Sequence, residues 1–239
     1  MSSTTGELFR EDAYLQSCSA AVTSVQPGVV HLDRTVFYPT GGGQPGDSGV
    51  LRFDGREIAV LDTVKGDAPG EIDHRIDPGA SLPAVGDMVE AAVDFERRHR
   101  LMRMHTCLHL LCKAVDGSVT GGSIGDGKGR LDFDIPDPVL DKDALTERLD
   151  AWIAEDHPVR AFWIDESAFD ERPELVKTMS VQPPRGSGRI RLVEIDGLDL
   201  QACGGTHVRS TAEIGRVRIH KIEKKGRQNR RVQIVLDGD

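Results

Sequence analysis

The segment RRHRLMRMHTCLHLLCKAV, residues 97–115, decides the fold. From Leu101 to Val115 its apolar side chains recur at spacings of three and four residues, a period that predicts an amphipathic helix. Asp116-Gly117 supplies the signal that ends it. The sequence before this helix carries strand-like runs, so the segment marks the point where an all-β part of the chain gives way to a mixed one.

Short runs of alternating polarity fill the residues that precede the helix. They predict strands over 29–38, 50–53, 58–64, 72–76 and 88–94, separated by Asp-Gly, Lys-Gly-Asp and Asp-Pro-Gly turn signals. A glycine-rich stretch, 40–49, follows the first of them. Strands at this spacing are typical of a small barrel or sandwich.

Helix and strand patterns alternate in the rest of the chain. A helix is predicted from Pro138 to Glu155, with Asp137 as its N-cap. The other predicted elements are a glycine-rich loop over 120–129, strands over 130–134, 159–164 and 190–195, and a hairpin of 213–222 with 231–236. We therefore expect an α+β fold, with a small N-terminal β-barrel domain in residues 1–95 and an α+β domain in 96–239.

The composition excludes several classes of protein. The chain has 239 residues, 38% hydrophobic and 29% charged, which is ordinary for a globular protein. No apolar stretch approaches the roughly 18 residues that a membrane span needs, and the first residues lack the pattern of a signal peptide. The four cysteines form no secreted disulfide framework. We expect a cytoplasmic protein that does not associate with a membrane and does not bind a nucleotide cofactor.

The charge is divided unevenly along the chain. The net charge is −9, yet residues 216–231 carry eight basic side chains against one acid, Glu223. A second basic cluster lies at the start of the helix. Two interpretations stay open: a solvated face, or local contact with nucleic-acid phosphates. On the second, the nucleic-acid-binding residues are Arg97, Arg98, Arg100, Lys221, Lys224, Lys225, Arg227, Arg230 and Arg231.

Two short motifs combine into a candidate metal site. His105 and His109, four residues apart, lie on one face of the predicted helix. The segment Cys203-Gly-Gly-Thr-His207 supplies a thiolate and a third imidazole across a turn that its glycines allow to be tight. Three imidazoles and one thiolate are ligands that Zn²⁺ prefers. Four protein ligands are typical of a structural site, so a catalytic role would require an open or fifth position.

These motifs, taken with four others, resemble the AlaX family, freestanding relatives of the editing domain of alanyl-tRNA synthetase. The resemblance covers most of the chain from Val29 onward. It is carried by RTVFYPTGGGQPGD (34–47), the His105–His109 pair, GGSI (121–124), RLDFD (130–134), the segment 203–207 and TAEIG (211–215).

The resemblance implies an aminoacyl-tRNA deacylase that acts in trans, without ATP, to maintain translation fidelity. It implies a β-barrel followed by a zinc-bearing editing domain of the threonyl- and alanyl-tRNA synthetase type. The implied substrate is mischarged tRNA(Ala), chiefly Ser-tRNA(Ala) and also Gly-tRNA(Ala), and the implied metal ligands are His105, His109, Cys203 and His207. The implied catalytic and substrate-binding residues are Thr40, Gly41, Gly42, Gly43, Gln44, Thr106, Ser123, Gly204, Gly205 and Thr206.

This sequence departs from the family pattern at Leu108, where editing domains commonly have threonine, so Thr106 and Gln44 become the candidates for sensing the serine hydroxyl. No Glu lies between the two histidines, which leaves a zinc-bound hydroxide, another residue or the terminal ribose hydroxyl as proton acceptor. Two further hypotheses stay open. One is a zinc-stabilised RNA-binding module without catalysis, and the other is a metal-dependent hydrolase of a small ester or amide.

Overall fold

The computed structural model describes residues 4–135, 140–176 and 188–237 as a mixed α+β protein. The chain divides into two compact units, residues 1–99 and 100–239. The predicted division into functional domains at residue 95 stays a prediction. Within the described residues, no helix has both the length and the apolar character needed to cross a membrane.

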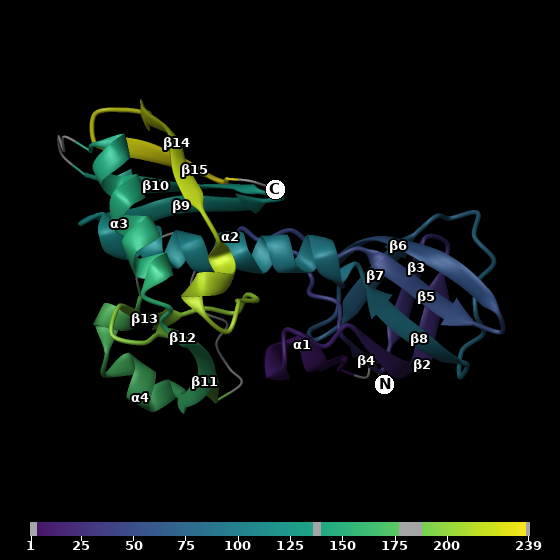
Figure 1. Ribbon diagram of the computed structural model, residues 1–239. Coiled ribbons are helices and arrows are strands. Elements are labelled where there is room, and N and C mark those ends of the chain that lie inside the picture. The colour runs from purple at the N-terminus through teal and green to yellow at the C-terminus, as the bar shows by residue number, and fades with distance from the viewer. Residues whose placement is uncertain (1–3, 136–139, 177–187, 238–239) are drawn as a thin grey trace. The chain divides into compact units, whose positions relative to one another are not determined.

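The first unit contains a closed antiparallel barrel (Figure 1). Its strands follow the order β2 (Ser17–Gln26), β3 (Val29–Leu32), β7 (Ile72–Ile76), β6 (Arg56–Lys65), β5 (Gly49–Phe53) and β8 (Met88–Val93). Alternate side chains such as Val30, Leu51 and Val89 point inward and are almost fully buried. Outside the barrel, β1 (Gly6–Glu7) pairs in parallel with β4 (Arg34–Thr35), and α1 (Leu8–Glu11) follows β1. The predicted barrel is therefore confirmed.

The predicted strand over 29–38 is interrupted: β3 ends at Leu32, β4 covers Arg34–Thr35, and the prediction is wrong for residues 36–38. The glycine-rich segment that follows is a hydrogen-bonded turn. Gly41 and Gln44 exchange backbone hydrogen bonds of 3.0 and 2.9 Å, while Gly42 and Gly43 have φ of 58° and 83°. Positive φ at both central residues is the geometry of the tightest hairpin turns, and glycine adopts it without strain.

A buried histidine in the barrel predicts a pH-dependent stability. His74 Nδ1 donates to the Val30 carbonyl (3.0 Å) and its Nε2 accepts from Thr35 Oγ1 (2.7 Å), an arrangement that suits the neutral ring. Burial lowers the pKa of His74 from 6.5 to about 4, against a smaller opposing effect of the Val30 carbonyl. Between these two pKa values, His74 is protonated in the unfolded chain and neutral in the folded chain. The free energy of unfolding should therefore fall by about 3 kcal/mol as the pH drops from 6.5 to 4.

Urea unfolding at several pH values measures this effect. The His74→Gln variant cannot titrate at this position and should lose that part of the pH dependence. Parallel stability curves for the two proteins would contradict the prediction.

The second unit contains one four-stranded antiparallel sheet, ordered β14 (Val217–Lys224), β15 (Asn229–Leu236), β10 (Lys128–Asp134) and β9 (Ser118–Gly125). The helix α2 (Phe95–Ala114) approaches β10 closely at Gly129, where a Cβ would lie 2.7 Å from Met104 Sδ. The helix α3 (Lys142–Ala154) covers the edge strand β14. Its Thr146 Oγ1 accepts a hydrogen bond from the Ile219 backbone N–H (3.1 Å), which removes an edge donor from water.

A second, three-stranded sheet has the order β11 (Val159–Asp165), β12 (Arg189–Ile195) and β13 (Asp199–Ala202), and all its pairs are antiparallel. One of its faces packs Ile190 and Leu192 against Phe169 of α4 (Glu166–Asp170) and Leu175 of η1 (Pro173–Leu175). A short 3₁₀ helix, η2 (Thr211–Ile214), precedes β14.

Three predicted elements of this unit need correction. The expected glycine-rich loop over 120–129 is most of β9 and the start of β10, because β9 pairs along β10 despite its glycines. The helix expected from Pro138 begins at Lys142, where the Asp141 side chain caps it by accepting from Ala144 N (2.8 Å). Asp137 and Pro138 lie outside the described residues. Glu213, expected in a strand, belongs to η2.

Candidate metal centre

Helix α2 places two imidazoles on one of its faces. Asp94 Oδ1 accepts from the Arg97 backbone N–H (3.1 Å) and so caps the first turn. Since residues four apart are neighbours on a helix, the rings of His105 and His109 lie with centroids 5.3 Å apart. Both side chains are buried, at 8% and 6% exposure. The two rings thus face each other along α2.

The segment after β13 brings the other two donors to the same place. Cys203 Sγ lies 3.5 Å from His105 Nε2 and 3.3 Å from His207 Nε2. One donor atom from each of the four residues, His105, His109, Cys203 and His207, lies within 4.8 Å of every other. Arg191 fixes this turn, because its Nη1 donates to the carbonyls of Cys203 (2.9 Å) and Gly205 (3.0 Å).

Two buried polar residues of β13 orient His109. A carboxylate accepts hydrogen bonds only, so both His109 Nδ1 (3.2 Å) and Gln201 Nε2 (2.7 Å) donate to Asp199 Oδ2. This assigns the proton of the neutral imidazole to Nδ1 and leaves the lone pair on Nε2. Sequence reasoning missed Asp199 and Gln201. The available signal was their alternation, Asp-x-Gln, in a strand that leads directly into Cys203.

Thr106 orients His207 in a similar way. Its hydroxyl donates to the Met102 carbonyl (3.0 Å), so the same oxygen accepts from His207 Nδ1 (3.1 Å) and from the Val208 backbone N–H (3.3 Å). Thr106 is fully buried and its hydroxyl makes these bonds inside the protein. His207 therefore also presents Nε2 as its ligand atom.

The electrostatics of the cluster favour a thiolate at Cys203 and a proton on His109. Burial by itself would raise the pKa of Cys203, but the imidazoles of His105 and His207 bring this pKa well below its ordinary value of 9.0. Burial lowers the pKa of His109, whereas Asp199 and Cys203 raise it to about 9. Without a metal, the cluster therefore holds a thiolate beside a protonated His109, and a metal ion would take the place of that proton.

The residues present fit a soft or borderline divalent metal ion. A thiolate and three imidazole nitrogens are ligands that zinc and its neighbours in the transition series take in tetrahedral sites. The fixed orientation of His109 and His207 adds the hydrogen-bonded outer layer that metal-binding histidines usually have. The group His105, His109, Cys203 and His207 could thus hold a metal ion.

The other residues assigned to substrate binding have varied settings. Next to the ligands, Gly205 and Thr206 are buried and Gly204 is half-buried. Ser123 is exposed on β9, opposite Arg130 of β10. The segment 40–44 belongs to the first unit, with Thr40 exposed and Gln44 fully buried. Their roles in substrate binding stay predictions.

The basic residues near the start of α2 form hydrogen bonds or ion pairs with other residues of the protein. Arg98, expected to contact tRNA, is instead fully buried and paired with Asp47 in the first unit. A side chain without exposed surface cannot reach a phosphate, so this assignment needs correction. Arg97 Nη1 donates to the Gly46 carbonyl (2.8 Å), and Arg100 Nη2 donates to Asp126 Oδ2 (3.0 Å).

A second cluster of ligand-type side chains lies in the barrel unit, at His31, Glu71 and Asp73. His31 Nε2 contacts Asp73 Oδ1 (2.8 Å), whereas its Nδ1 faces Glu71 Oε1 (3.5 Å). The carboxylates therefore approach opposite nitrogens of one ring, which is a hydrogen-bonding arrangement rather than a chelate. Arg75 also pairs with Asp73 Oδ2 (2.7 Å). We assign this group a structural role.

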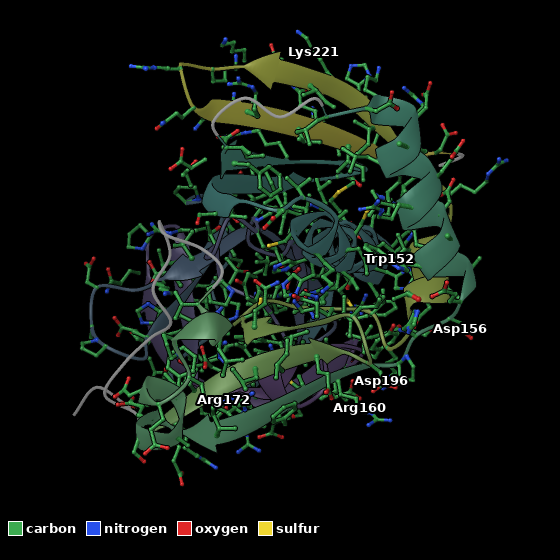
Figure 2. The ribbon with its side chains drawn as sticks, turned by 90° about the vertical axis from the view of Figure 1, so that its left-hand side faces the viewer. Trp152, Asp156, Arg160, Arg172, Asp196 and Lys221 are labelled. Carbon is green, nitrogen blue, oxygen red and sulfur yellow. The ribbon has the colours of Figure 1, made fainter. Side chains whose placement is uncertain are left out.

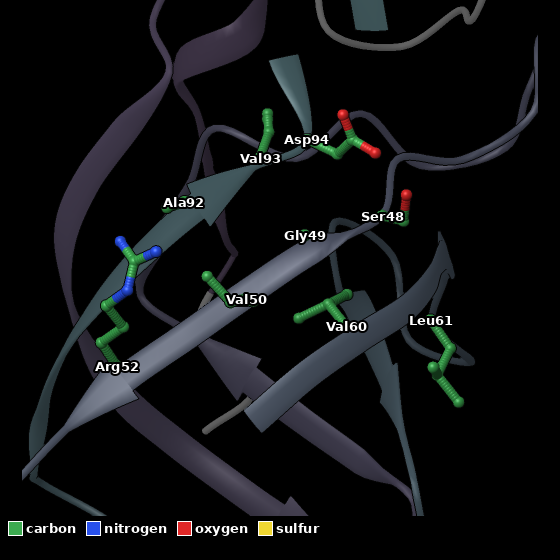
Figure 3. Close-up of a pocket in the computed structure, with 9 residues that line it drawn as sticks. All are labelled: Ser48, Gly49, Val50, Arg52, Val60, Leu61, Ala92, Val93 and Asp94. Atoms are coloured by element: carbon green, nitrogen blue, oxygen red, sulfur yellow. The ribbon is translucent and has the colours of Figure 1, made fainter. Parts of the chain in front are cut away.

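An open pocket of about 480 Å³ lies between β5, β6 and β8 of the barrel unit (Figure 3). Its two charged lining residues already have partners. Arg52 pairs with Glu57 and Glu90, and Asp94 caps α2. The remaining lining is small or apolar, and no metal-cluster residue contributes to it. The pocket therefore lacks converging catalytic groups.

Comparisons with known proteins identify the family of this chain. A family model described as "Threonyl and Alanyl tRNA synthetase second additional domain" matches residues 190–233, and one described as "tRNA synthetases class II (A)" matches 7–97. The alanyl-tRNA editing protein AlaX-M of Methanosarcina mazei is 36% identical over 244 residues, which cover 97% of this chain and 96% of that protein.

Two other relatives extend the comparison. AlaX-M of Saccharolobus solfataricus is 34% identical over 236 residues, 95% of this chain and 97% of that protein. An alanine–tRNA ligase of Caldivirga maquilingensis is 36% identical over 237 residues, 92% of this chain but 25% of the ligase. Full-length similarity to the editing proteins confirms the resemblance seen in the sequence motifs: this chain belongs to the AlaX family of alanyl-tRNA editing proteins.

Proposed function

We propose that this protein is an aminoacyl-tRNA deacylase that hydrolyses the ester of mischarged tRNA(Ala), chiefly Ser-tRNA(Ala) and also Gly-tRNA(Ala), with Zn²⁺ as its metal. The observation that carries the proposal is the convergence of His105, His109, Cys203 and His207 in a chain of the AlaX family. An alanine pocket cannot strongly reject glycine or serine by binding alone, so a separate hydrolytic site has a physical purpose.

The chain's own residues prepare the site in three ways. Asp199 and Gln201 hold His109 with Nε2 toward the cluster, and Thr106 does the same for His207. Arg191 holds the turn that carries Cys203. When bound there, Zn²⁺ supplies a Lewis acid that polarises the ester carbonyl or an attacking water.

A deacylation assay tests the proposal. Purified protein is incubated with Ser-tRNA(Ala), Gly-tRNA(Ala) and Ala-tRNA(Ala), with and without a chelator, and release of the amino acid is followed. Hydrolysis of the first two substrates that stops on chelation is expected. Binding of tRNA without cleavage would instead support an RNA-binding module, and equal cleavage of a simple serine ester would support a small-ester hydrolase.

The β14–β15 hairpin is the proposed tRNA contact, and the structure separates its charges into two sets. Lys221 and Lys225 approach Glu223 at 2.9 and 3.6 Å. Arg231 pairs with Asp132 (2.7 Å), and Arg230, only 7% exposed, donates to the Gly226 carbonyl (3.3 Å). Lys224 and Arg227 are exposed and make no ion pair with the described residues. Lys221 lies on β14 (Figure 2).

Neutralising Lys224 and Arg227 together should reduce the salt dependence of tRNA binding. Each phosphate contact contributes about 0.7 to 0.9 to the slope of log affinity against log salt concentration, so the slope should fall by about 1.5. Filter binding at several salt concentrations measures it. Lys221→Ala is the matched control, since Glu223 already compensates this charge, and it should change the slope less. Unchanged slopes in both variants would show that the charges of the hairpin are solvated and do not contact tRNA.

A further inference from the structure

One face of the three-stranded sheet continues from the metal cluster to an exposed edge. Side chains on a strand alternate between faces, and residues opposite each other on paired strands share a face. Asp199 and Gln201 of β13, which contact the cluster, lie opposite Ile195 and Val193 of β12. Arg191 is on the same side of β12, two residues from Val193. This face therefore leads from the cluster toward β11.

Trp163 lies at the outer end of this face. It is the β11 residue opposite Arg191. Cβ atoms of such cross-strand pairs are about 5 Å apart, so the side chains of Trp163 and Arg191 leave the sheet from adjacent positions on this face. Arg191 in turn donates to the carbonyl of the metal ligand Cys203 (2.9 Å). One side chain thus separates Trp163 from the turn that carries the ligands.

The surroundings of Trp163 suit a nucleobase better than an apolar protein partner. The side chain is 44% exposed on an edge strand. The guanidinium of Arg189 lies over its ring, with Cζ 5.8 Å from the centroid. Ala161 and Asp165 are its neighbours along this face of β11, so within this strand the described residues do not extend the apolar surface of Trp163. An exposed aromatic ring beside arginine is the usual platform for an unstacked base and its phosphate.

We infer that Trp163 stacks on the terminal nucleobase of the tRNA 3′ end, while Arg189 meets an adjoining phosphate. The inference rests on the proposed function and adds the place where the substrate's nucleic-acid end binds. The ester to be hydrolysed is on the ribose of the terminal nucleotide, so the base of that nucleotide must settle close to the metal cluster. Trp163 offers an exposed stacking surface at that place.

Intrinsic fluorescence gives a direct test. The chain has two tryptophans, and the Trp152→Phe variant leaves Trp163 as the single indole. Trp152 belongs to α3, whereas Trp163 belongs to β11, the strand on which Figure 2 labels Arg160. Titration with the trinucleotide CCA should quench the remaining fluorescence, and the dinucleotide CC should quench it much less. Equal quenching by the two, or none by either, would overturn the inference.

Steady-state kinetics provide the second readout. Trp163→Ala should raise KM for Ser-tRNA(Ala) about tenfold with little change in kcat, since a stacked base contributes roughly that factor to affinity. Trp163→Phe should recover part of it. Phe162→Ala is the matched control, because Phe162 is 38% exposed but points to the opposite face. Equal KM changes for Trp163→Ala and Phe162→Ala would show a general effect on the strand and overturn the inference.

The two proposals fail in distinguishable ways. If the wild-type protein cleaves no charged tRNA, the proposed function fails, and CCA titration still decides whether Trp163 binds a terminal base. If the wild-type protein cleaves Ser-tRNA(Ala) and Trp163→Ala leaves KM unchanged, only the stacking role fails. Metal content and melting temperature are measured for each variant, and Trp163→Ala should change neither.

Discussion

His109→Ala is expected to lose the bound metal and to hydrolyse mischarged tRNA roughly a thousandfold more slowly, because polarisation by a metal ion is worth several kcal/mol. The substitution removes one of four donors that lie within 4.8 Å of each other. It also removes the imidazole N–H that Asp199 accepts at 3.2 Å. The cluster is then left with three donors and a cavity where the ring was, which is a poor site for a tetrahedral ion.

Two measurements check this expectation, namely elemental analysis of the purified protein and release of serine from Ser-tRNA(Ala). His220→Ala is the matched control, since His220 is exposed on β14 and is not a member of the cluster. Asp199→Ala keeps all four donors and removes the carboxylate that accepts from His109 and Gln201. It should weaken metal binding about 10- to 100-fold, an effect intermediate between the other two variants.

The possible departures have different meanings. Full metal content in His109→Ala would show that the ion binds elsewhere. Loss of the metal with an unchanged rate of hydrolysis would show that the metal takes no part in the reaction. Loss of the metal with unfolding, in a protein that cleaves no charged tRNA, would leave a structural metal site, the alternative that a four-ligand count favours.

The sequence indicated the four candidate ligands because their spacing is local. An i, i+4 pair on a helix and a Cys-x-x-x-His turn can each be recognised within five residues. Asp199 and Gln201 could not be recognised in this way, because their contact with His109 joins β13 to a helix about ninety residues earlier. Polar residues at alternate positions are also typical of a strand with one face in water, so Asp-x-Gln indicates no metal site until its partner is known.

Glycine misled the prediction for residues 120–129. Gly121 and Gly122 suggested a loop, yet both pair along β10. The structure supplies the reason at Gly122, where a Cβ would lie 3.0 Å from Leu131 Cδ2, so the strands have little room for a larger residue there. Glycine in a strand marks a close approach, and sequence alone does not distinguish this from a flexible turn.

The basic cluster at the start of α2 was ambiguous for a related reason. A charged side chain is stabilised either by an ion pair or by water, and the sequence does not show which of the two applies. Arg98 finds Asp47, a residue 51 positions earlier, and its Nη2 and Nη1 also donate to the carbonyls of Val36 (2.7 Å) and Ala13 (3.1 Å). All these partners belong to the first unit. The guanidinium is therefore a structural cross-link of the barrel unit.

Arg98→Met is accordingly expected to lower the free energy of unfolding by about 3 to 5 kcal/mol, the usual cost of removing one partner from a buried ion pair. Arg98 is fully buried and Asp47 is 1% exposed, so water cannot replace the lost guanidinium without opening the structure. Much of the loss should come from the carboxylate left behind. The double variant Arg98→Met, Asp47→Leu should therefore recover a large part of it.

Urea unfolding of the two single variants and the double variant measures this coupling. The salt dependence of tRNA binding tests the alternative, in which Arg98 contacts a phosphate. If Arg98 is structural, the double variant, once folded, should keep the wild-type salt slope, because the removed charge had no exposed surface to offer a phosphate. A slope that falls by nearly one, with unchanged unfolding free energy in Arg98→Met, would restore Arg98 to the tRNA surface. The two measurements together therefore distinguish a structural ion pair from a tRNA contact at Arg98, which the number of charges in the sequence could not do.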